Sequence, residues 1–272
     1  MNKKLKKALK IAPILGVAAL LVTIIPLWIL AIPVLAYLTF GVIDVSRNEL
    51  TDEAPVWKSY FVGNGLLTWL LSPFNLLMDL LAQKKPGVLQ LSDLPEDCQR
   101  EITDVISVVT REKDNIVERM QSQMADSKRV MLLFKWYGRQ VNDTISDFNK
   151  DYKYMRTIGI SLFNANAATT YHFGPLRITY RVLYNLTPVE SDDVFIQVGR
   201  TKHIWRDEPL FIFDDTLMHR SVNGSDQPRY CLFADIMRPS VFSPLNSKIL
   251  DGIGVLLKAV NRIFYKNWDF IT

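Results

Sequence analysis

Thr157-Ile-Gly-Ile-Ser-Leu-Phe163 is the stretch of the sequence from which the fold class follows most directly. It is short, it is rich in β-branched and aromatic side chains, and the turn signal Asn-Ala-Asn follows it at once. Similar runs recur between further turn signals, at residues 176–186, 194–198, 210–213 and 230–237. Several short strands separated by turns are typical of a double-sheet jelly roll. The sequence therefore predicts a mainly β domain of this kind.

Residues 93–128, which precede these strands, are charged and carry a helical pattern. The apolar positions recur at spacings of three and four residues: Ile102, Val105, Ile106, Val109, Ile116 and Met120. We expect a helix or a pair of helices that flanks one side of the β core, and a helical extension of a membrane stalk is the alternative. A basic amphipathic pattern predicts another helix over residues 247–267, which could lie on a bilayer surface or pack on its own domain.

The N-terminal region is strongly apolar. Residues 11–43 contain no charged side chain, whereas a bilayer span needs about 20 residues. Lysines precede this stretch and acids follow it, so the positive-inside rule places the N-terminus in the cytoplasm. The apolar core of a signal peptide is only about 7–15 residues long, so we expect a retained anchor. Residues 60–82 form a second apolar region, which is either a second span or a segment lying on the membrane surface.

These patterns divide the chain into three parts. We expect residues 1–86 to form a membrane anchor with one span or a two-span hairpin, residues 87–240 the β domain, and residues 241–272 the amphipathic C-terminal helix. The net charge of +4 comes largely from the N-terminal lysines, which favours contact with anionic lipid headgroups over nucleic acid. Cys98 and Cys231 offer no paired disulfide framework, so a reducing compartment is expected for the folded domain.

His172 and His219 are the residues with the most specific chemical signal. Iron(II) oxygenases usually present two histidines and one carboxylate and leave other positions open for cosubstrate and oxygen. The carboxylate usually stands two residues after the first histidine, and that position is Gly174 here. From spacing alone, His172 is therefore either a metal ligand or a structural histidine beside a Gly-Pro turn. Asp214 and Asp215 precede His219, and they could orient an imidazole or simply form a turn.

Several dispersed motifs carry a resemblance to a known family. They are His172-Phe-Gly-Pro175, Phe213-Asp-Asp followed by His219, and Asp235-Ile-Met-Arg-Pro239, with Arg181 and Arg229 at matching places between them. Over roughly residues 88–240 the sequence resembles the aspartyl/asparaginyl β-hydroxylase family. The resemblance implies a double-stranded β-helix that depends on iron(II) and 2-oxoglutarate and binds iron with two histidines and no carboxylate. Phe134-Lys-Trp-Tyr-Gly138 and the apolar N-terminus look most similar to the lipid A 2-hydroxylase branch.

The resemblance also implies roles for single residues. His172 and His219 match the iron ligands, and Arg229 matches the arginine that pairs with the distal carboxylate of 2-oxoglutarate, a task that suits a planar guanidinium. Further contacts with the cosubstrate are implied for three residues: Arg181, Ser161 and Trp136. Exposed strand arginines in salt bridges remain the alternative for both arginines, and a plain core role remains the alternative for Trp136.

Leu183 departs from the family pattern. The family carries a second cosubstrate-contacting histidine at this place, two residues after the position of Arg181. A leucine removes a hydrogen-bond donor, so binding of 2-oxoglutarate could be weaker or its pose different. His203 matches no motif, and we expect it to be a surface histidine or one with satisfied hydrogen bonds.

The resemblance and the anchor together imply a function. We expect a membrane-anchored iron(II)/2-oxoglutarate dioxygenase that hydroxylates the acyl chain of a lipid, with lipid A as the favoured substrate. A bacterial inner membrane with the catalytic domain facing the cytosol is the expected location, because ferrous iron and 2-oxoglutarate are chiefly cytosolic. One alternative is hydroxylation of an aspartyl or asparaginyl side chain in a peptide or protein. Another is an inactive interaction module, motivated by Leu183.

Overall fold

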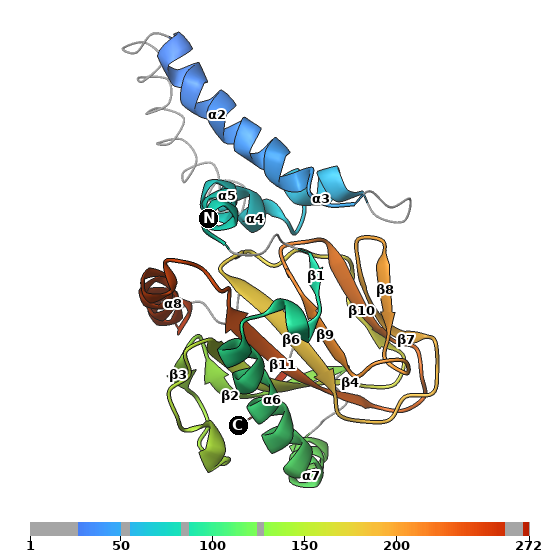
Figure 1. Ribbon diagram of the computed structural model, residues 1–272. Coiled ribbons are helices and arrows are strands. Elements are labelled where there is room, and N and C mark those ends of the chain that lie inside the picture. Colours follow the sequence, from blue (N-terminus) through green and yellow to red (C-terminus); the bar gives the residue numbers. More distant parts are fainter. Residues whose placement is uncertain (1–26, 50–54, 83–86, 124–127, 259–268, 272) are drawn as a thin grey trace, which may run out of the picture.

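The structure, a computed structural model, describes residues 27–49, 55–82, 87–123, 128–258 and 269–271. The α-helices are α2 (Leu27–Val45), α3 (Val56–Val62), α4 (Leu66–Leu70), α5 (Ser72–Leu81), α6 (Glu96–Arg111), α7 (Lys113–Gln123) and α8 (Ser243–Lys258). Figure 1 shows N-terminal helices seated on one end of a β-sandwich, with α6, α7 and α8 beside the sandwich. Two short 3-10 turns are η1 (Leu91–Asp93) and η2 (Ser146–Phe148).

Two sheets build the sandwich. The larger has the order β1-β9-β6-β11-β4-β2-β12 with β3 beside β2, and the smaller has the order β5-β10-β7-β8. The strands are β1 (Val88–Leu89), β2 (Arg129–Trp136), β3 (Arg139–Gln140), β4 (Met155–Phe163), β5 (Ala167–Ala168), β6 (Thr179–Asn185), β7 (Val194–Val198), β8 (Thr201–Ile204), β9 (Leu210–Phe213), β10 (His219–Asn223), β11 (Arg229–Met237) and β12 (Asp269–Ile271). The described pairings are antiparallel except that of β12 with β2. The predicted mainly β domain is confirmed.

The strand predictions were right for five segments in which apolar side chains dominate. All five predicted segments are strands, namely β4, β6, β7, β9 and β11. β4 and β11 are central in the larger sheet, and every residue of both is buried, which explains their nearly continuous apolar runs. The prediction missed the other described strands, β1, β2, β3, β5, β8, β10 and β12. Of these, β8 and β10 are rich in polar residues and belong to the smaller sheet, whereas β2 is apolar and almost entirely buried.

Two apolar cores lie on the two faces of the larger sheet. The core between the sheets joins side chains such as Leu183 and Phe233 of the larger sheet to Ile196 and Val198 of the smaller one. The core on the opposite face is covered by α6 and α7, whose Ile102 and Met120 are fully buried. The predicted helix pair is therefore confirmed as a flank of the β domain, and the alternative of a stalk extension is wrong.

The N-terminal helices differ from the predicted two-span hairpin. Residues 60–82 lie in three short helices, α3 to α5, which are interrupted at Gly63, Gly65 and Leu71. These helices pack against the β domain through buried Tyr60, Thr68, Asn75 and Met78. A second span is therefore wrong for this segment. Among the described residues no helix combines the length and the apolar character needed to cross a bilayer. Residues 11–26 of the predicted first span lie outside the described residues.

The C-terminal prediction is right in part. Helix α8 is present, and its Leu250 is fully buried in the core beneath α6 and α7, so the helix packs on its own domain. The assignment of all of residues 241–272 to a helix is wrong, because β12 follows and pairs with β2. Residues 259–268 of the predicted helix lie outside the described part of the chain.

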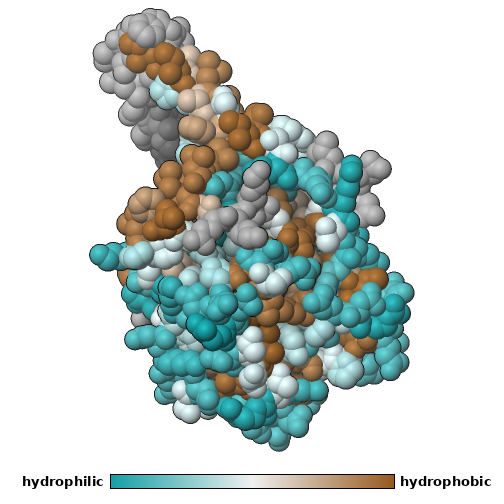
Figure 2. All heavy atoms as spheres, in the orientation of Figure 1, coloured by the Kyte–Doolittle hydropathy of each residue, from teal (hydrophilic) through white to brown (hydrophobic). Residues whose placement is uncertain are grey.

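Large apolar side chains are exposed on the N-terminal helices. Figure 2 shows them as a brown surface that contrasts with the mainly teal β domain. The exposed members on these helices are Ile29, Ile32, Val34, Leu35, Leu38, Phe40, Val42, Ile43, Trp57, Val62, Leu66, Leu70, Leu77 and Leu80. We call this set the apolar helical surface. Its extent exceeds the scattered apolar residues that ordinary soluble surfaces carry.

Candidate functional site

The structure brings His172 and His219 together. His219 begins β10, and His172 lies in the loop that follows β5. Their backbones form an isolated antiparallel bridge, with N···O distances of 3.0 and 2.9 Å in the two directions. Side chains directly opposite each other in an antiparallel pair lie on the same face. The two imidazole ring centroids are accordingly 4.2 Å apart.

Hydrogen bonds fix the protonation of both rings. Nδ1 of His172 lies 2.8 Å from the backbone oxygen of Thr170, and Nδ1 of His219 lies 2.8 Å from that of Leu217. A carbonyl oxygen can only accept, so each Nδ1 carries the proton and each Nε2 keeps its lone pair. This is the arrangement that usually orients metal-binding histidines. Burial lowers the pKa of both imidazoles, and the positive charge of Arg181 adds to the effect, so both rings are neutral near pH 7.

Asp215 lies beside the histidine pair and explains Gly174. The backbone N–H of Gly174 donates to the backbone oxygen of Asp215 at 2.6 Å. A Cβ atom at position 174 would lie 2.6 Å from Asp215 Oδ1 and closer still to its carboxyl carbon, so only glycine fits. The Asp215 carboxylate thus occupies the space of the missing side chain, where other iron(II) oxygenases carry their carboxylate. Burial raises the pKa of Asp215 to about 7, although Arg181 opposes the shift.

Arg181 holds this carboxylate in place. Its Nη2 lies 2.9 Å from Asp215 Oδ2, its Nε lies 2.6 Å from Asp235 Oδ1, and its guanidinium stacks 3.9 Å above the ring of Phe233. The alternative of a salt-bridged strand arginine therefore fits Arg181, although it is not exposed. The contact with a cosubstrate implied by the family stays a prediction for this residue.

Arg229 has a different environment. It begins β11, is only 2% exposed, and donates from Nη2 to Ser221 Oγ at 3.1 Å. Its Nε and Nη1 are buried and have no hydrogen-bond partner among the described residues. The rings of Phe163 and Trp205 each lie 5.0 Å from the guanidinium. A buried cation with unsatisfied donors is costly, so this site fits an anion with several acceptor atoms. The alternative of an exposed arginine is wrong for Arg229.

The remaining predicted contacts also lie on the inner side of the sandwich. Ser161 is buried and donates to the backbone oxygen of Cys231 at 3.2 Å, and Trp136 belongs to the core between the sheets. Leu183 pairs with both Phe211 and Phe233, which makes the middle of the interior apolar at the level where the family carries a histidine. These positions are compatible with cosubstrate contacts, and the individual roles stay predictions.

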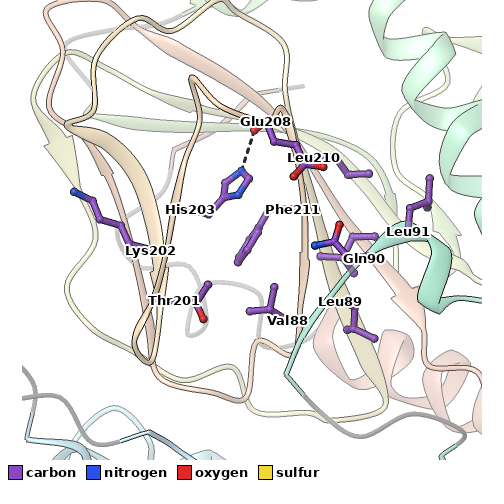
Figure 3. Close-up of a pocket in the computed structure, with 11 residues that line it drawn as sticks. Val88, Leu89, Gln90, Leu91, Thr201, Lys202, His203, Glu208, Leu210 and Phe211 are labelled. Carbon is purple, nitrogen blue, oxygen red and sulfur yellow. Dashed lines mark hydrogen bonds between the residues drawn. The ribbon is translucent and has the colours of Figure 1, made fainter.

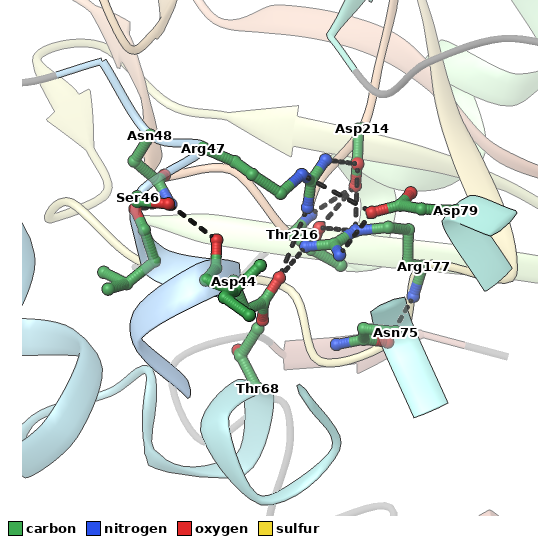
Figure 4. Close-up of polar contacts among 12 residues, drawn as sticks. Asp44, Ser46, Arg47, Asn48, Thr68, Asn75, Asp79, Arg177, Asp214 and Thr216 are labelled. Atoms are coloured by element: carbon green, nitrogen blue, oxygen red, sulfur yellow. Dashed lines mark hydrogen bonds and ion pairs between the residues drawn. The ribbon is translucent and has the colours of Figure 1, made fainter. Parts of the chain in front are cut away.

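A buried charge network underlies the segment before His219, and sequence reasoning missed it. Figure 4 shows Arg177 between acids of three segments: Asp44 in α2, Asp79 in α5 and Asp214. Its guanidinium contacts all three, at 2.9 Å for Asp79 and 3.4 Å for Asp214. Arg47 and Arg238 complete the network. The isolated acid Asp79 within an apolar run was the one available signal, because buried charges require partners.

A cavity of about 320 Å³ lies away from the two imidazoles. It opens between β1, β8 and β9, with Val88, Leu89 and Leu210 on one side and Thr201 and His203 on the other, as Figure 3 shows. His203 lies 2.9 Å from the backbone oxygen of Glu208 through Nε2 and stacks on Phe211. The expectation that His203 has satisfied contacts agrees with this arrangement.

Comparison with solved structures gives low overall likeness. The viral collagen prolyl hydroxylase of Paramecium bursaria Chlorella virus-1, in its 2OG complex, shares 11% identity, with coverage of 48% of this chain and 91% of that one and a TM-score of 0.35. A 2OG-Fe(II) oxygenase family protein of Burkholderia pseudomallei shares 14%, with coverage of 35% and 49% and a TM-score of 0.28. An RmlC-like cupin of Desulfovibrio desulfuricans shares 13%, with coverage of 41% and 87% and a TM-score of 0.27.

The sequence comparisons are more decisive. No curated protein sequence matches the chain. The family model for aspartyl/asparaginyl β-hydroxylases matches residues 96–239, which is more than half of the 272 residues. The matched range contains the histidine pair, Asp215 and both inner arginines. The chain therefore belongs to the aspartyl/asparaginyl β-hydroxylase family and is a dioxygenase that acts as a hydroxylase.

Proposed function

We propose that the protein is an iron(II)- and 2-oxoglutarate-dependent hydroxylase whose substrate is the acyl chain of a membrane lipid. The assignment of metal and cosubstrate is supported by the pairing of His172 and His219, in which each Nδ1 is hydrogen-bonded to the backbone and each Nε2 is available. The same sandwich also buries Arg229, whose Nε and Nη1 have no hydrogen-bond partner among the described residues. The donor set fits iron, because imidazole nitrogens suit this metal and the neutral rings need not lose a proton.

Each residue then has a defined task. His172 and His219 hold the metal through Nε2, and their Nδ1–H groups keep the rings in orientation. Arg229 offers Nε–H and Nη1–H to one carboxylate of the cosubstrate, a charge-assisted contact that also satisfies its buried donors. The apolar interior around Leu183 and Phe233 excludes water from the reacting groups. Bound iron(II) and 2-oxoglutarate supply the oxidising chemistry for C–H hydroxylation.

Asp215 has a supporting task at the same site. Its carboxyl group fills the space beside Gly174 that a third ligating side chain would need, and Arg181 holds this group, while the Gly174 N–H binds the backbone oxygen of Asp215. Among the described residues no group of three or more histidine, cysteine or acidic side chains is arranged to hold a metal ion. We therefore assign iron binding to the two imidazoles and assign Asp215 the task of shaping the open side of the site.

The apolar helical surface supports the proposal that the substrate is a lipid. This surface lies on the helices that pack directly on the histidine loops, so a bilayer in contact with it would be near the proposed iron site. The sequence before it is apolar, and five lysines lie among residues 3–10 ahead of this apolar stretch, which suits an anionic membrane. Lipid A is our favoured example, and we place the protein at a bacterial inner membrane with the β domain in the cytosol.

Hydroxylation of an aspartyl or asparaginyl side chain is the second candidate, because the family is named for it. The two candidates differ in where oxygen is added. Lipid extracts from cells with and without the gene should differ in 2-hydroxy fatty acids if a lipid is the substrate. A gain of about 16 mass units on a peptide, with unchanged lipids, would instead favour the protein substrate.

Turnover can be tested without knowing the substrate. Detergent-solubilised protein supplied with iron(II), 2-oxoglutarate, dioxygen and ascorbate, which serves as reductant in place of the substrate, should release succinate and carbon dioxide. His219→Ala should abolish this release, whereas His203→Ala, which changes a histidine outside the proposed site, should retain most of it. Equal succinate release by wild type and His219→Ala would refute the proposed metal site.

A further inference from the structure

The N-terminal helices hold the loop that carries His172 through polar side chains. Asn64 donates to the backbone oxygen of Tyr171 at 2.6 Å, and Thr68 donates to that of Gly174 at 3.0 Å. The ring of Tyr60 also packs edge-on against Phe173 at 5.5 Å between centroids. Contacts therefore lie on both sides of His172 along the loop. They come from α3, α4 and the turn between them.

Asn75 closes this loop from its other end. Its Nδ2 donates to the backbone oxygen of Pro175 at 3.1 Å, and its Oδ1 accepts from the backbone N–H of Arg177 at 3.0 Å. The side chain is fully buried, and Figure 4 shows it directed at Arg177. An amide is the side chain that offers a donor and an acceptor side by side, so it holds a chain segment much as a neighbouring strand would. Polar residues in helix interiors need a reason of this kind.

The same helical unit also holds the segment that leads to His219. Asn48, just after α2, accepts from the backbone N–H of Met218 at 2.7 Å. Arg47 pairs with Asp214 at 3.2 Å. Arg177 then joins the two loops, because its Nε donates to Thr216 Oγ1 at 3.1 Å while Asn75 binds its backbone. Both proposed ligand segments are thus held from the N-terminal side.

We propose that Asn75 is a positioning residue for metal binding, acting through the His172 loop, with Thr68 as its partner in this task. The inference rests on the proposed iron site. A site with only two protein ligands has no third side chain to hold the metal if one ring moves, so the relative placement of the two loops decides the affinity. Loss of a group that hydrogen-bonds a ligand directly typically weakens metal binding by about 10–100-fold, and contacts that hold the ligand's loop should act in the same direction.

Cobalt(II), which gives a visible spectrum, is the probe for the test. Metal-free full-length protein is titrated with cobalt(II), and the apo melting temperature is recorded for each variant. Asn75→Ala removes both contacts, and Thr68→Val removes one hydroxyl with almost no change of shape. Asn246→Ala is the matched control, because Asn246 is buried in α8 and donates to Ser240 Oγ, far along the chain from either histidine loop.

We expect wild type to bind cobalt(II) with a spectrum that changes in His219→Ala, and Asn75→Ala and Thr68→Val to bind it at least about tenfold more weakly. Asn246→Ala should lower the melting temperature yet bind cobalt(II) like wild type. Unchanged affinity in folded Asn75→Ala or Thr68→Val would overturn the inference, as would an equal loss in Asn246→Ala. If Asn75→Ala does not fold, Thr68→Val alone decides. Absence of cobalt binding by wild type would instead refute the iron site itself.

Discussion

Gly174→Ala tests the contact on which the shape of the proposed site depends. The new methyl group would lie 2.6 Å from Asp215 Oδ1, so either the carboxylate or the backbone must move. The Asp215 side chain cannot rotate away freely, because Arg181 Nη2 lies 2.9 Å from its Oδ2. The backbone is also fixed, since the Gly174 N–H donates to the backbone oxygen of Asp215 at 2.6 Å. Overpacking of a well-packed interior typically costs about 1–3 kcal/mol. We expect a loss of stability in this range.

Urea denaturation of the metal-free protein measures this loss in the free energy of unfolding. In thermal unfolding, the melting temperature should fall by about 2–4 °C for each kcal/mol in a domain of this size. Gly252→Ala is the matched control, because a Cβ there meets nothing within 4 Å and the position lies in α8. It should stabilise the protein by about 0.5–1 kcal/mol, as alanine does in a helix.

A double variant isolates the cause. If the Asp215 carboxylate is the obstacle, Gly174→Ala should cost much less in an Asp215→Ala background, since contacting residues show strong non-additivity. The reasoning is refuted if Gly174→Ala is as stable as Gly252→Ala. It is equally refuted if the loss is the same with and without the carboxylate.

Three further outcomes are expected. Arg229→Gln should raise the KM for 2-oxoglutarate by about 10–100-fold, because hydrogen bonds to charged groups contribute about 1.5–3 kcal/mol, without lowering the melting temperature; an unchanged KM would contradict the assignment. Burial lowers the pKa of His219 in the folded protein below the usual histidine value of 6.5, so the unfolded chain binds more protons as the pH falls and the metal-free protein should lose stability from pH 7 to pH 5. His219→Gln should reduce this loss. An identical dependence of stability on pH in urea denaturation of the two proteins would argue against this reasoning. Leu80→Glu changes a side chain that is 83% exposed on the apolar helical surface, so it should reduce co-sedimentation with phosphatidylglycerol vesicles at an unchanged melting temperature; undiminished binding would exclude that surface as the contact.

The sequence was sufficient for elements with a clear local period. The buried strands and the helix pair follow from the spacing of side chains such as Ile102 and Ile160, because one face or both must be apolar. It was insufficient for residues 60–82, since an apolar run is the same in a membrane span and in helices buried against a domain. Gly63, Gly65 and Pro73 interrupt that run, and they mark where the three short helices begin or end.

The candidate site also contains residues that the sequence could predict and contacts that it could not. The histidines and Arg229 were found through short motifs, and the structure brings the histidines together. The placement of Asp215 against Gly174 and the hold of Asn75 on Pro175 join residues far apart in the chain, so no local pattern could predict them. A polar side chain inside an apolar segment was the only local trace of these contacts.

The pairing of β12 with β2 has a practical consequence for handling the protein. β12 covers the outer backbone of β2, whose N–H and C=O groups would otherwise face solvent as an open template for another chain. Removing the last residues is therefore expected to promote aggregation even if the hydroxylase site is untouched. Affinity tags and truncations are therefore better kept away from β12.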